Sequence, residues 1–269
     1  MKNTLMFKRF LMVAIPLALA APAWATGCPA SPMALSAIPV TPPNGCFAGN
    51  DLFSNFVVNS SIAPDTIING VTLAPTTWLT PPDNTTIDLN AAAGGGIALT
   101  SSNPLGTAFC GTPTANITPK TFCIGGAPFA LDSVITYDVH AVVGSISQLE
   151  LDGTVVSHSS GASGATAVVF REFCLGTTTF SQGCSNYGVL QIGAVKGKFT
   201  TLSQSASQVF GGVTDIAIRD TVYLQTFGPT GEWAGVTDFE LFTPEPATFG
   251  LVGLALAGLG ALRFRKRKV

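Results

Sequence analysis

The chain has 269 residues, of which 46% are hydrophobic and only 10% are charged, with a formal net charge of −2. All 15 acidic residues but only five basic ones lie between Thr26 and Pro246, so this region alone carries a charge of −10. Such a balance argues against nucleic acid, anionic lipid and phosphate-rich partners. It is compatible with divalent cations, with neutral polysaccharide, or with a merely soluble surface.

The N-terminus has the three parts of a secretory signal peptide. Lys2, Lys8 and Arg9 precede an apolar run over residues 10–21, and Ala23 and Ala25 form the small-x-small cleavage site. We therefore expect a signal peptide over residues 1–25 and an exported protein. A lipoprotein is the alternative, because residues 25–28 resemble a degraded lipobox; lipidation of Cys28 would leave five other cysteines, an odd number.

Six cysteines form three pairs that are close in sequence. An exported chain meets an oxidising compartment, so disulfides are expected. Six cysteines allow 15 pairings, and proximity favours the local ones. The predicted bonds are Cys28–Cys46, Cys110–Cys123 and Cys174–Cys184.

The first half of the region between the termini has the composition of a β-protein, with short β-branched and aromatic runs bounded by Gly, Pro, Asn and Asp. Residues 26–43 are predicted to be an extended lead-in and residues 104–128 a loop. Strands are expected over residues 52–59, 86–89 and 96–100. Asn69-Gly70 predicts a type I′ hairpin between residues 66–68 and 71–73.

The second half has a clearer strand pattern. Alternation from residue 131 to 141 predicts a half-buried strand with Ile135, Tyr137 and Val139 facing inward. Asp152-Gly153 predicts a second type I′ hairpin between residues 146–151 and 154–159. Further strands are expected over residues 165–174, 189–195, 198–202, 213–219, 222–227 and 236–242. Residues 44–243 are therefore predicted to form an all-β domain, a β-sandwich of jelly-roll kind.

Few residues of this region suggest catalysis, and we expect no enzyme, no cofactor and no metal site. Ser163 lacks the surroundings of a nucleophile elbow, and His140 and His158 read as ordinary surface histidines. The pairs Glu150/Asp152 and Asp238/Glu240 could serve a hydrolase, but a turn and a solvated strand face are the simpler readings.

Two tryptophans, Trp78 and Trp233, lie near Pro or Gly turns and could stack on sugar rings; packing in the core or beneath a loop is the alternative role.

The C-terminal segment, residues 244–269, has three parts in series. Pro244, Glu245 and Pro246 precede an apolar run of 16 residues and a basic end with Arg263, Arg265, Lys266, Arg267 and Lys268. At 1.5 Å per residue the run spans roughly 24 Å, and snorkelling arginines can extend it toward the roughly 30 Å of a hydrocarbon core. We therefore expect a transmembrane helix whose basic end stays in the cytoplasm.

This arrangement resembles the PEP-CTERM sorting signal of exported bacterial proteins. The resemblance implies processing by an exosortase-type membrane peptidase; an ordinary tail anchor is the alternative. It further implies a precursor anchored in the inner membrane and a mature protein at the cell surface or in the extracellular matrix. A structural or adhesive role in biofilm or exopolysaccharide follows by analogy. A carbohydrate-binding module and a polysaccharide hydrolase are the competing functions for the β-domain.

Overall fold

The computed structural model describes residues 27–38, 45–59, 67–69, 71–72, 87–92, 95–101, 122–125, 130–158, 165–181, 183–197, 201–226 and 233–243. Both predicted terminal segments lie outside these ranges. The described part of the chain contains no helix with the length and apolarity needed to cross a membrane.

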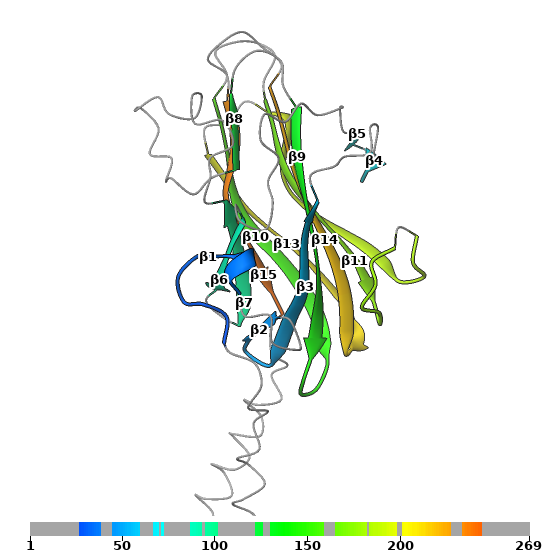
Figure 1. Cartoon of the computed structure of the whole chain (residues 1–269). Coiled ribbons are helices and arrows are strands. Elements are labelled where there is room, and N and C mark those ends of the chain that lie inside the picture. Colours follow the sequence, from blue (N-terminus) through cyan, green and yellow to red (C-terminus); the bar gives the residue numbers. More distant parts are fainter. Residues whose placement is uncertain are drawn as a thin grey trace, which may run out of the picture.

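Two antiparallel sheets pack face to face as a sandwich (Figure 1). In spatial order the six-stranded sheet contains β12 (Tyr187–Gly197), β11 (Ala165–Leu175), β14 (Asp215–Thr226), β9 (Ala130–Ala141), β3 (Asp51–Asn59) and β2 (Gly45–Ala48). The seven-stranded sheet contains β1 (Met33–Ala34), β6 (Ile87–Ala92), β7 (Gly96–Ser101), β15 (Trp233–Phe242), β10 (Ile146–His158) and β13 (Thr201–Val213), and β8 (Phe122–Gly125) pairs with the start of β15. The all-β sandwich is thus confirmed.

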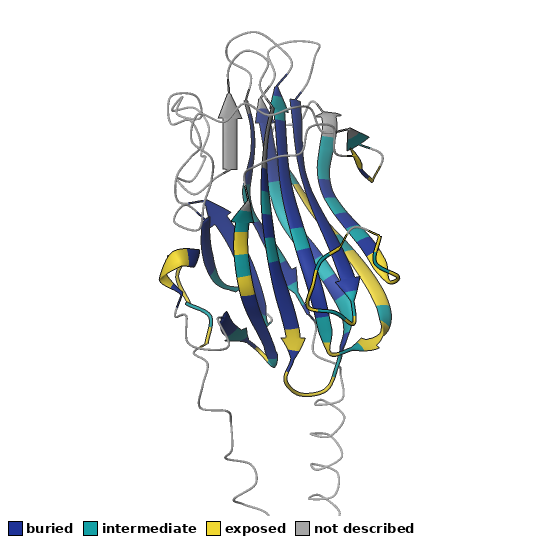
Figure 2. Cartoon of the chain, turned by 45° about the vertical axis from the view of Figure 1, so that its right-hand side comes forward, coloured by how far each residue is buried: buried dark blue, intermediate teal, exposed yellow. Residues whose placement is uncertain are grey.

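The hydrophobic core lies between the sheets, where alternate residues of each strand point inward. Ile135, Tyr137 and Val139 are at most 2% exposed, as their alternation predicted. Phe239 and Leu241 of β15 are fully buried on the facing sheet. Figure 2 shows buried residues along the central strands and exposed ones at the loops below them.

The predicted hairpin at Asn69 is present as β4 (Ile67–Ile68) and β5 (Val71–Thr72). Asn69 has a φ of 50°, the left-handed conformation that a type I′ turn requires. Ile68 packs on Phe170 and Tyr223, which are buried on the outer face of the six-stranded sheet. The hairpin therefore covers part of that outer face.

The sequence placed strand boundaries wrongly in the last third of the chain. The strands expected over residues 213–219 and 222–227 are one strand, β14, which continues through Arg219, Asp220 and Thr221. The 13-residue strand β13 was expected to end at Leu202, because its Ser- and Gln-rich sequence lacks a strong β signal. Interior contacts of Asp220 and the ladder with β10 keep these segments extended.

Two smaller predictions also need correction. The predicted loop over residues 104–128 contains the strand β8. The lead-in contains β1 and a 3₁₀ turn, η2 (Leu35–Ala37), and places Leu35 and Ile38 in the core. The lead-in is therefore part of the folded domain.

Candidate functional site

An open cleft of about 440 Å³ lies on the outer face of the seven-stranded sheet, over β13, β10 and β15. We call it the acidic cleft. Its lining residues are Asp152, Gly153, Thr154, Ser203, Gln204, Ser205, Asp238 and Glu240, most of which carry a carboxylate or a hydroxyl. The Gln204 amide does not face the cleft, because its Oε1 accepts a hydrogen bond from Gly193 N–H of the six-stranded sheet at 2.5 Å. No lysine or arginine is among these residues.

Strand register explains why the carboxylates meet. Asp152 of β10 lies directly opposite Glu240 of β15, and Thr154 lies opposite Asp238. Side chains directly opposite in an antiparallel pair have Cβ atoms about 4.5–5.5 Å apart. The two carboxylate pairs that the sequence showed separately therefore form one acidic group on a single sheet face.

Hydroxyl groups accompany these carboxylates from both sides. Ser205 of β13, whose backbone lies opposite Asp152, donates its Oγ hydrogen to Glu150 Oε1 at 3.0 Å. The Thr237 hydroxyl donates to Asp238 Oδ1 at 2.7 Å. Asp152 Oδ1 is buried and has no hydrogen-bond partner among the described residues. This oxygen is an acceptor that the described side chains leave unused, and it lies beneath the cleft surface.

The surroundings of Glu240 in the cleft change the pKa of its carboxyl group. Burial, and then the neighbouring carboxylates Asp238 and Asp152, raise the pKa of Glu240 above its ordinary value of 4.5. The two described arginines that could neutralise this charge are bound elsewhere: Arg171 pairs with Asp220, and Arg219 pairs with Glu172. Neither described arginine side chain therefore neutralises the carboxylates of the cleft.

Asp152-Gly153 is not a turn, which corrects the second predicted hairpin. Both residues lie inside the single strand β10, and Gly153 points toward the core. A Cβ on Gly153 would lie 2.6 Å from Ile192 Cδ1 and 2.8 Å from the Asp238 carbonyl oxygen. This glycine is needed for close packing between the sheets. Asp152 is consequently a residue of the sheet face and not a solvated turn residue.

A buried polar network supports the cleft from inside the core. Arg171 of β11 binds Asp220 of β14 through two hydrogen bonds of 2.7 and 2.9 Å, and both side chains are fully buried. Tyr137 donates its hydroxyl hydrogen to Asp220 Oδ2 at 2.8 Å, and burial keeps the pKa of Tyr137 well above 10.0. Arg171 Nη1 reaches the backbone carbonyls of Glu150 and Glu240, each at 3.1 Å. The network therefore ties both cleft strands to the opposite sheet.

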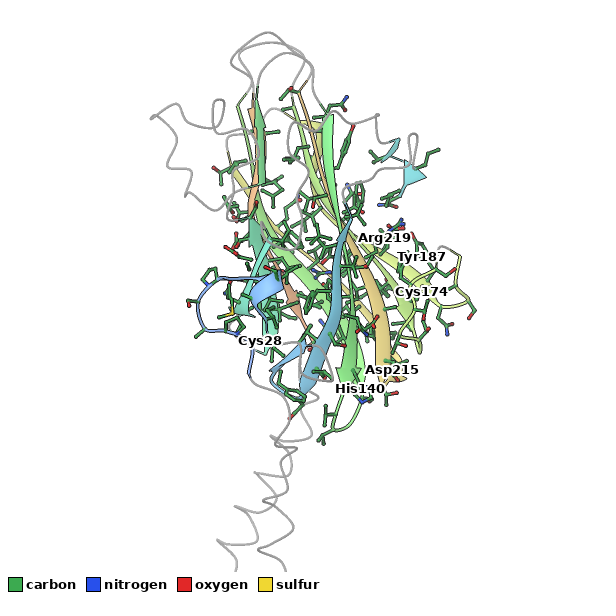
Figure 3. The ribbon with its side chains drawn as sticks, in the orientation of Figure 1. Cys28, His140, Cys174, Tyr187, Asp215 and Arg219 are labelled. Atoms are coloured by element: carbon green, nitrogen blue, oxygen red, sulfur yellow. A yellow bond between two sulfur atoms is a disulfide. The ribbon has the colours of Figure 1, made fainter. Side chains whose placement is uncertain are left out.

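A second polar cluster lies on the outer face of the six-stranded sheet. Glu172 accepts hydrogen bonds from Tyr187 at 2.5 Å and from Arg219 Nε at 2.6 Å, and the Arg219 guanidinium stacks 4.8 Å from the Phe180 ring centroid. Figure 3 shows Tyr187 and Arg219 close to each other on this sheet. The charges of Arg219 and Glu172 neutralise each other, so we interpret this cluster as structural.

The structure describes the side chain of His140 but not that of His158. His140 is exposed at the end of β9 and binds Asp215 through Nδ1 at 2.7 Å (Figure 3). The Thr214 hydroxyl donates to Asp215 Oδ2 at 2.7 Å, but in the described hydrogen bonds no hydroxyl or thiol contacts the His140 ring. His158 ends β10, and its side chain lies outside the described residues, as does Ser163.

Two of the three predicted disulfides are confirmed, Cys28–Cys46 and Cys174–Cys184. Cys123 lies in β8, but Cys110 lies outside the described residues, so the third bond stays a prediction. Among the described residues, no three His, Cys, Asp or Glu side chains are grouped so that they could hold a metal ion.

The remaining predicted site residues cannot be placed. Ala23, Ala25, Trp78 and all residues from Pro244 onward lie outside the described ranges. Trp233 begins β15, but its side chain is also outside the description.

Comparison with known proteins identifies one family feature. Residues 242–267 match the PEP-CTERM protein-sorting motif, which includes the Pro-Glu-Pro triplet and most of the basic end. A search of curated protein sequences gives no match.

Solved structures give only distant similarities. A carbohydrate-binding module, TmCBM61 in complex with beta-1,4-galactotriose, is 13% identical, with a TM-score of 0.28, and the match covers 46% of this chain and 69% of that one. A carbohydrate-binding module of the beta-sandwich superfamily is 11% identical over 75% of this chain and 94% of its own, with a TM-score of 0.21. Infectious bursal disease virus, Gx strain, is 14% identical, with a TM-score of 0.23, over 77% of this chain and 54% of its own. At these values the similarities carry no argument about function.

Proposed function

We propose that this chain, which carries a PEP-CTERM sorting motif and is therefore an exported protein sorted by an exosortase-type peptidase, is an adhesive component of the extracellular matrix. Its precursor is held in the inner membrane by residues 244–269, and its mature sandwich is delivered to the cell surface or matrix. There it holds neutral polysaccharide in the acidic cleft. The domain has no catalytic role.

The observation that carries the proposed ligand class is the facing of Asp152 and Glu240 within one cleft. Carboxylates accept hydrogen bonds from sugar hydroxyls, and hydrogen bonds to charged groups contribute about 1.5–3 kcal/mol each. The accompanying serine and threonine hydroxyls can both donate and accept. A polysaccharide that carries its own negative charge would be repelled by three unneutralised carboxylates.

Aromatic stacking could add to this binding. Trp233 opens the strand that carries Asp238 and Glu240, which puts its backbone on the same strand as the cleft. Stacking by Trp233 or Trp78 is a prediction that rests on the sequence.

A polysaccharide hydrolase is the second candidate, and the raised pKa of Glu240 favours it. A glycosidase needs one protonated and one ionised carboxyl group, typically about 5–10 Å apart. Asp152 and Glu240 occupy neighbouring strand positions compatible with that spacing. We favour binding without turnover, because the cleft is open, and because burial and then the neighbouring carboxylates account for the raised pKa of Glu240 without any catalytic role.

The test is a glycan array and a matrix pull-down with the processed protein, combined with a reducing-end assay on every glycan that binds. The proposal expects retention on neutral glycans, little retention on uronate-containing or sulfated ones, and no new reducing ends. Release of reducing ends would establish the hydrolase instead. Failure to bind any neutral glycan or matrix preparation would contradict the proposed function.

A further inference from the structure

The strand β13 forms an exposed edge of the seven-stranded sheet. It pairs with β10 along one side, and no other described strand pairs with its second side. Nine of its 13 residues are exposed, and Val209 is 73% exposed. β12 of the facing sheet comes close to β13, and Gly193 N–H donates a hydrogen bond to Gln204 Oε1 there, but among the described strands the second side of the β13 backbone is unpaired.

The other sheet edges are protected in the usual ways, by short strands, charges or bulges. β1 has two residues and β2 has four. β12 carries Lys196 and has a register shift in its pairing with β11. β13 has no charged residue and no proline, and its register with β10 is regular from Thr201 to Val209. Only this edge strand is long, regular and uncharged among the described residues.

The geometry points to a second copy of this chain as the occupant of that edge, joined by antiparallel pairing of β13 with β13. The regular stretch from Thr201 to Val209 is centred on Ser205, so a two-fold axis at Ser205 pairs it with itself. Ser203 then faces the partner's Ser207, and Thr201 faces the partner's Val209. Serine hydroxyls both donate and accept, so the strand is chemically complementary to its own copy.

The acidic charge of the domain does not prevent this pairing. The nearest carboxylates of the seven-stranded sheet lie on β10, one strand inward. In the joined sheet the two β10 strands are separated by three strand spacings, about 14 Å at about 4.8 Å each. This exceeds the roughly 8 Å Debye length at physiological ionic strength, so their repulsion is screened.

Pairing about this axis would place both acidic clefts on the same side of one continuous sheet. Ser203 and Ser205 line the cleft from β13, so the two clefts would adjoin across the new interface. If the clefts bind polysaccharide as proposed, the dimer would bind one chain at two points and gain avidity without new contacts. The gain in avidity rests on the proposed function, whereas the dimer itself does not.

The test uses charges at the ends of the paired stretch, away from the cleft lining. The wild-type processed protein is expected to be a dimer in sedimentation velocity at physiological salt. In Thr201→Lys/Val209→Lys, two lysine pairs would face each other and weaken the dimer by about tenfold. Thr201→Glu/Val209→Glu should behave in the same way.

Mixing the lysine and glutamate variants provides the control, because it should restore a heterodimer through two opposite-charge pairs. Loss of pairing through misfolding would not be rescued by mixing. A wild-type monomer throughout the micromolar range, or variants that dimerise as the wild type does, would overturn the inference. A dimer that binds no glycan would contradict the proposed function alone, and a glycan-binding monomer would contradict the dimer alone.

Discussion

The Arg171 guanidinium, inside the core, donates a 3.1 Å hydrogen bond to the backbone carbonyl of Glu240, whose carboxylate lines the cleft on the outer face of the same sheet. Arg171 makes the same contact with Glu150 on the neighbouring strand. A single residue of the six-stranded sheet therefore contacts two of the three strands that line the acidic cleft, β10 and β15.

Replacing Arg171 with methionine should destabilise the domain by about 3–5 kcal/mol, because the buried Asp220 carboxylate would lose its counter-charge and keep only the hydrogen bond from Tyr137. The double variant Arg171→Met/Asp220→Leu removes both charges and should recover much of this loss. Urea unfolding followed by tryptophan fluorescence measures both changes. A single variant that loses less than the double variant would show that the pair does not act as a unit.

Stability should respond to pH in opposite ways at Glu240 and Asp215. The pKa of Glu240 is raised in the folded state, so its contribution is present below its unfolded pKa and is lost as pH rises through the folded pKa. Glu240→Gln should therefore gain stability relative to the wild type as pH rises above about 4.5, since it cannot ionise.

The Asp215 variant provides the opposite case. Hydrogen bonds from His140 and then Thr214 lower the pKa of Asp215 below 3.8, so its stabilisation is present at neutral pH and is lost as pH falls through the folded value. Asp215→Asn should be less stable than the wild type at neutral pH, with the difference vanishing in acid. Urea midpoints from about pH 3 to pH 7 test both variants, and a pH-independent difference for either would contradict the assigned cause.

Gly153→Ala should destabilise the domain by about 1–3 kcal/mol, as expected for overpacking between two sheets. The new Cβ would meet Ile192 Cδ1, which can turn aside, and the Asp238 carbonyl oxygen, which cannot move without shifting the backbone of β15. Gly211→Ala is the matched control, because nothing lies within 4 Å of a Cβ at that position. Equal thermal midpoints for the two variants would refute the packing role of Gly153.

The sequence predicted much of the fold because the physical signals were local. Alternation identified the inward face of β9, Asn69-Gly70 marked a true hairpin, and sequence proximity identified two disulfides. The jelly-roll class of the sandwich, the domain boundaries and the terminal signals stay predictions, apart from the sorting motif found at residues 242–267.

The sequence failed where a local signal was overruled by a distant contact. The dipeptide Asp152-Gly153 predicts a turn, but the structure needs a glycine at position 153 for another reason. Ile192, 39 residues away in the sequence, packs where a Cβ of residue 153 would lie. Asp220 and Thr221 were expected to separate two strands, but Asp220 pairs with Arg171 inside the core. The cleft was missed for the same reason, since only the register of β10 with β15 brings Asp152 opposite Glu240.

The sorting motif gives a prediction outside the folded domain. Glu245→Ala removes the centre of the Pro-Glu-Pro triplet but leaves the apolar run and basic end, which we propose hold the precursor in the membrane. The variant should insert and remain uncut. Gel shift and fractionation in cells with and without the sorting peptidase measure this. Normal cleavage of the variant would mean that the sorting peptidase does not recognise the Pro-Glu-Pro triplet.

The central claim, that the acidic cleft binds neutral polysaccharide, is tested most directly by affinity electrophoresis of the processed protein through gels containing a neutral polysaccharide found on the array. Asp152→Ala/Glu240→Ala removes two facing acceptors and should weaken retardation by at least about tenfold, given about 1.5–3 kcal/mol for each charged hydrogen bond. Asp215→Ala, which removes a partly exposed carboxylate outside the cleft, should be retarded as strongly as the wild type. Undiminished retardation of the cleft variant would contradict the account.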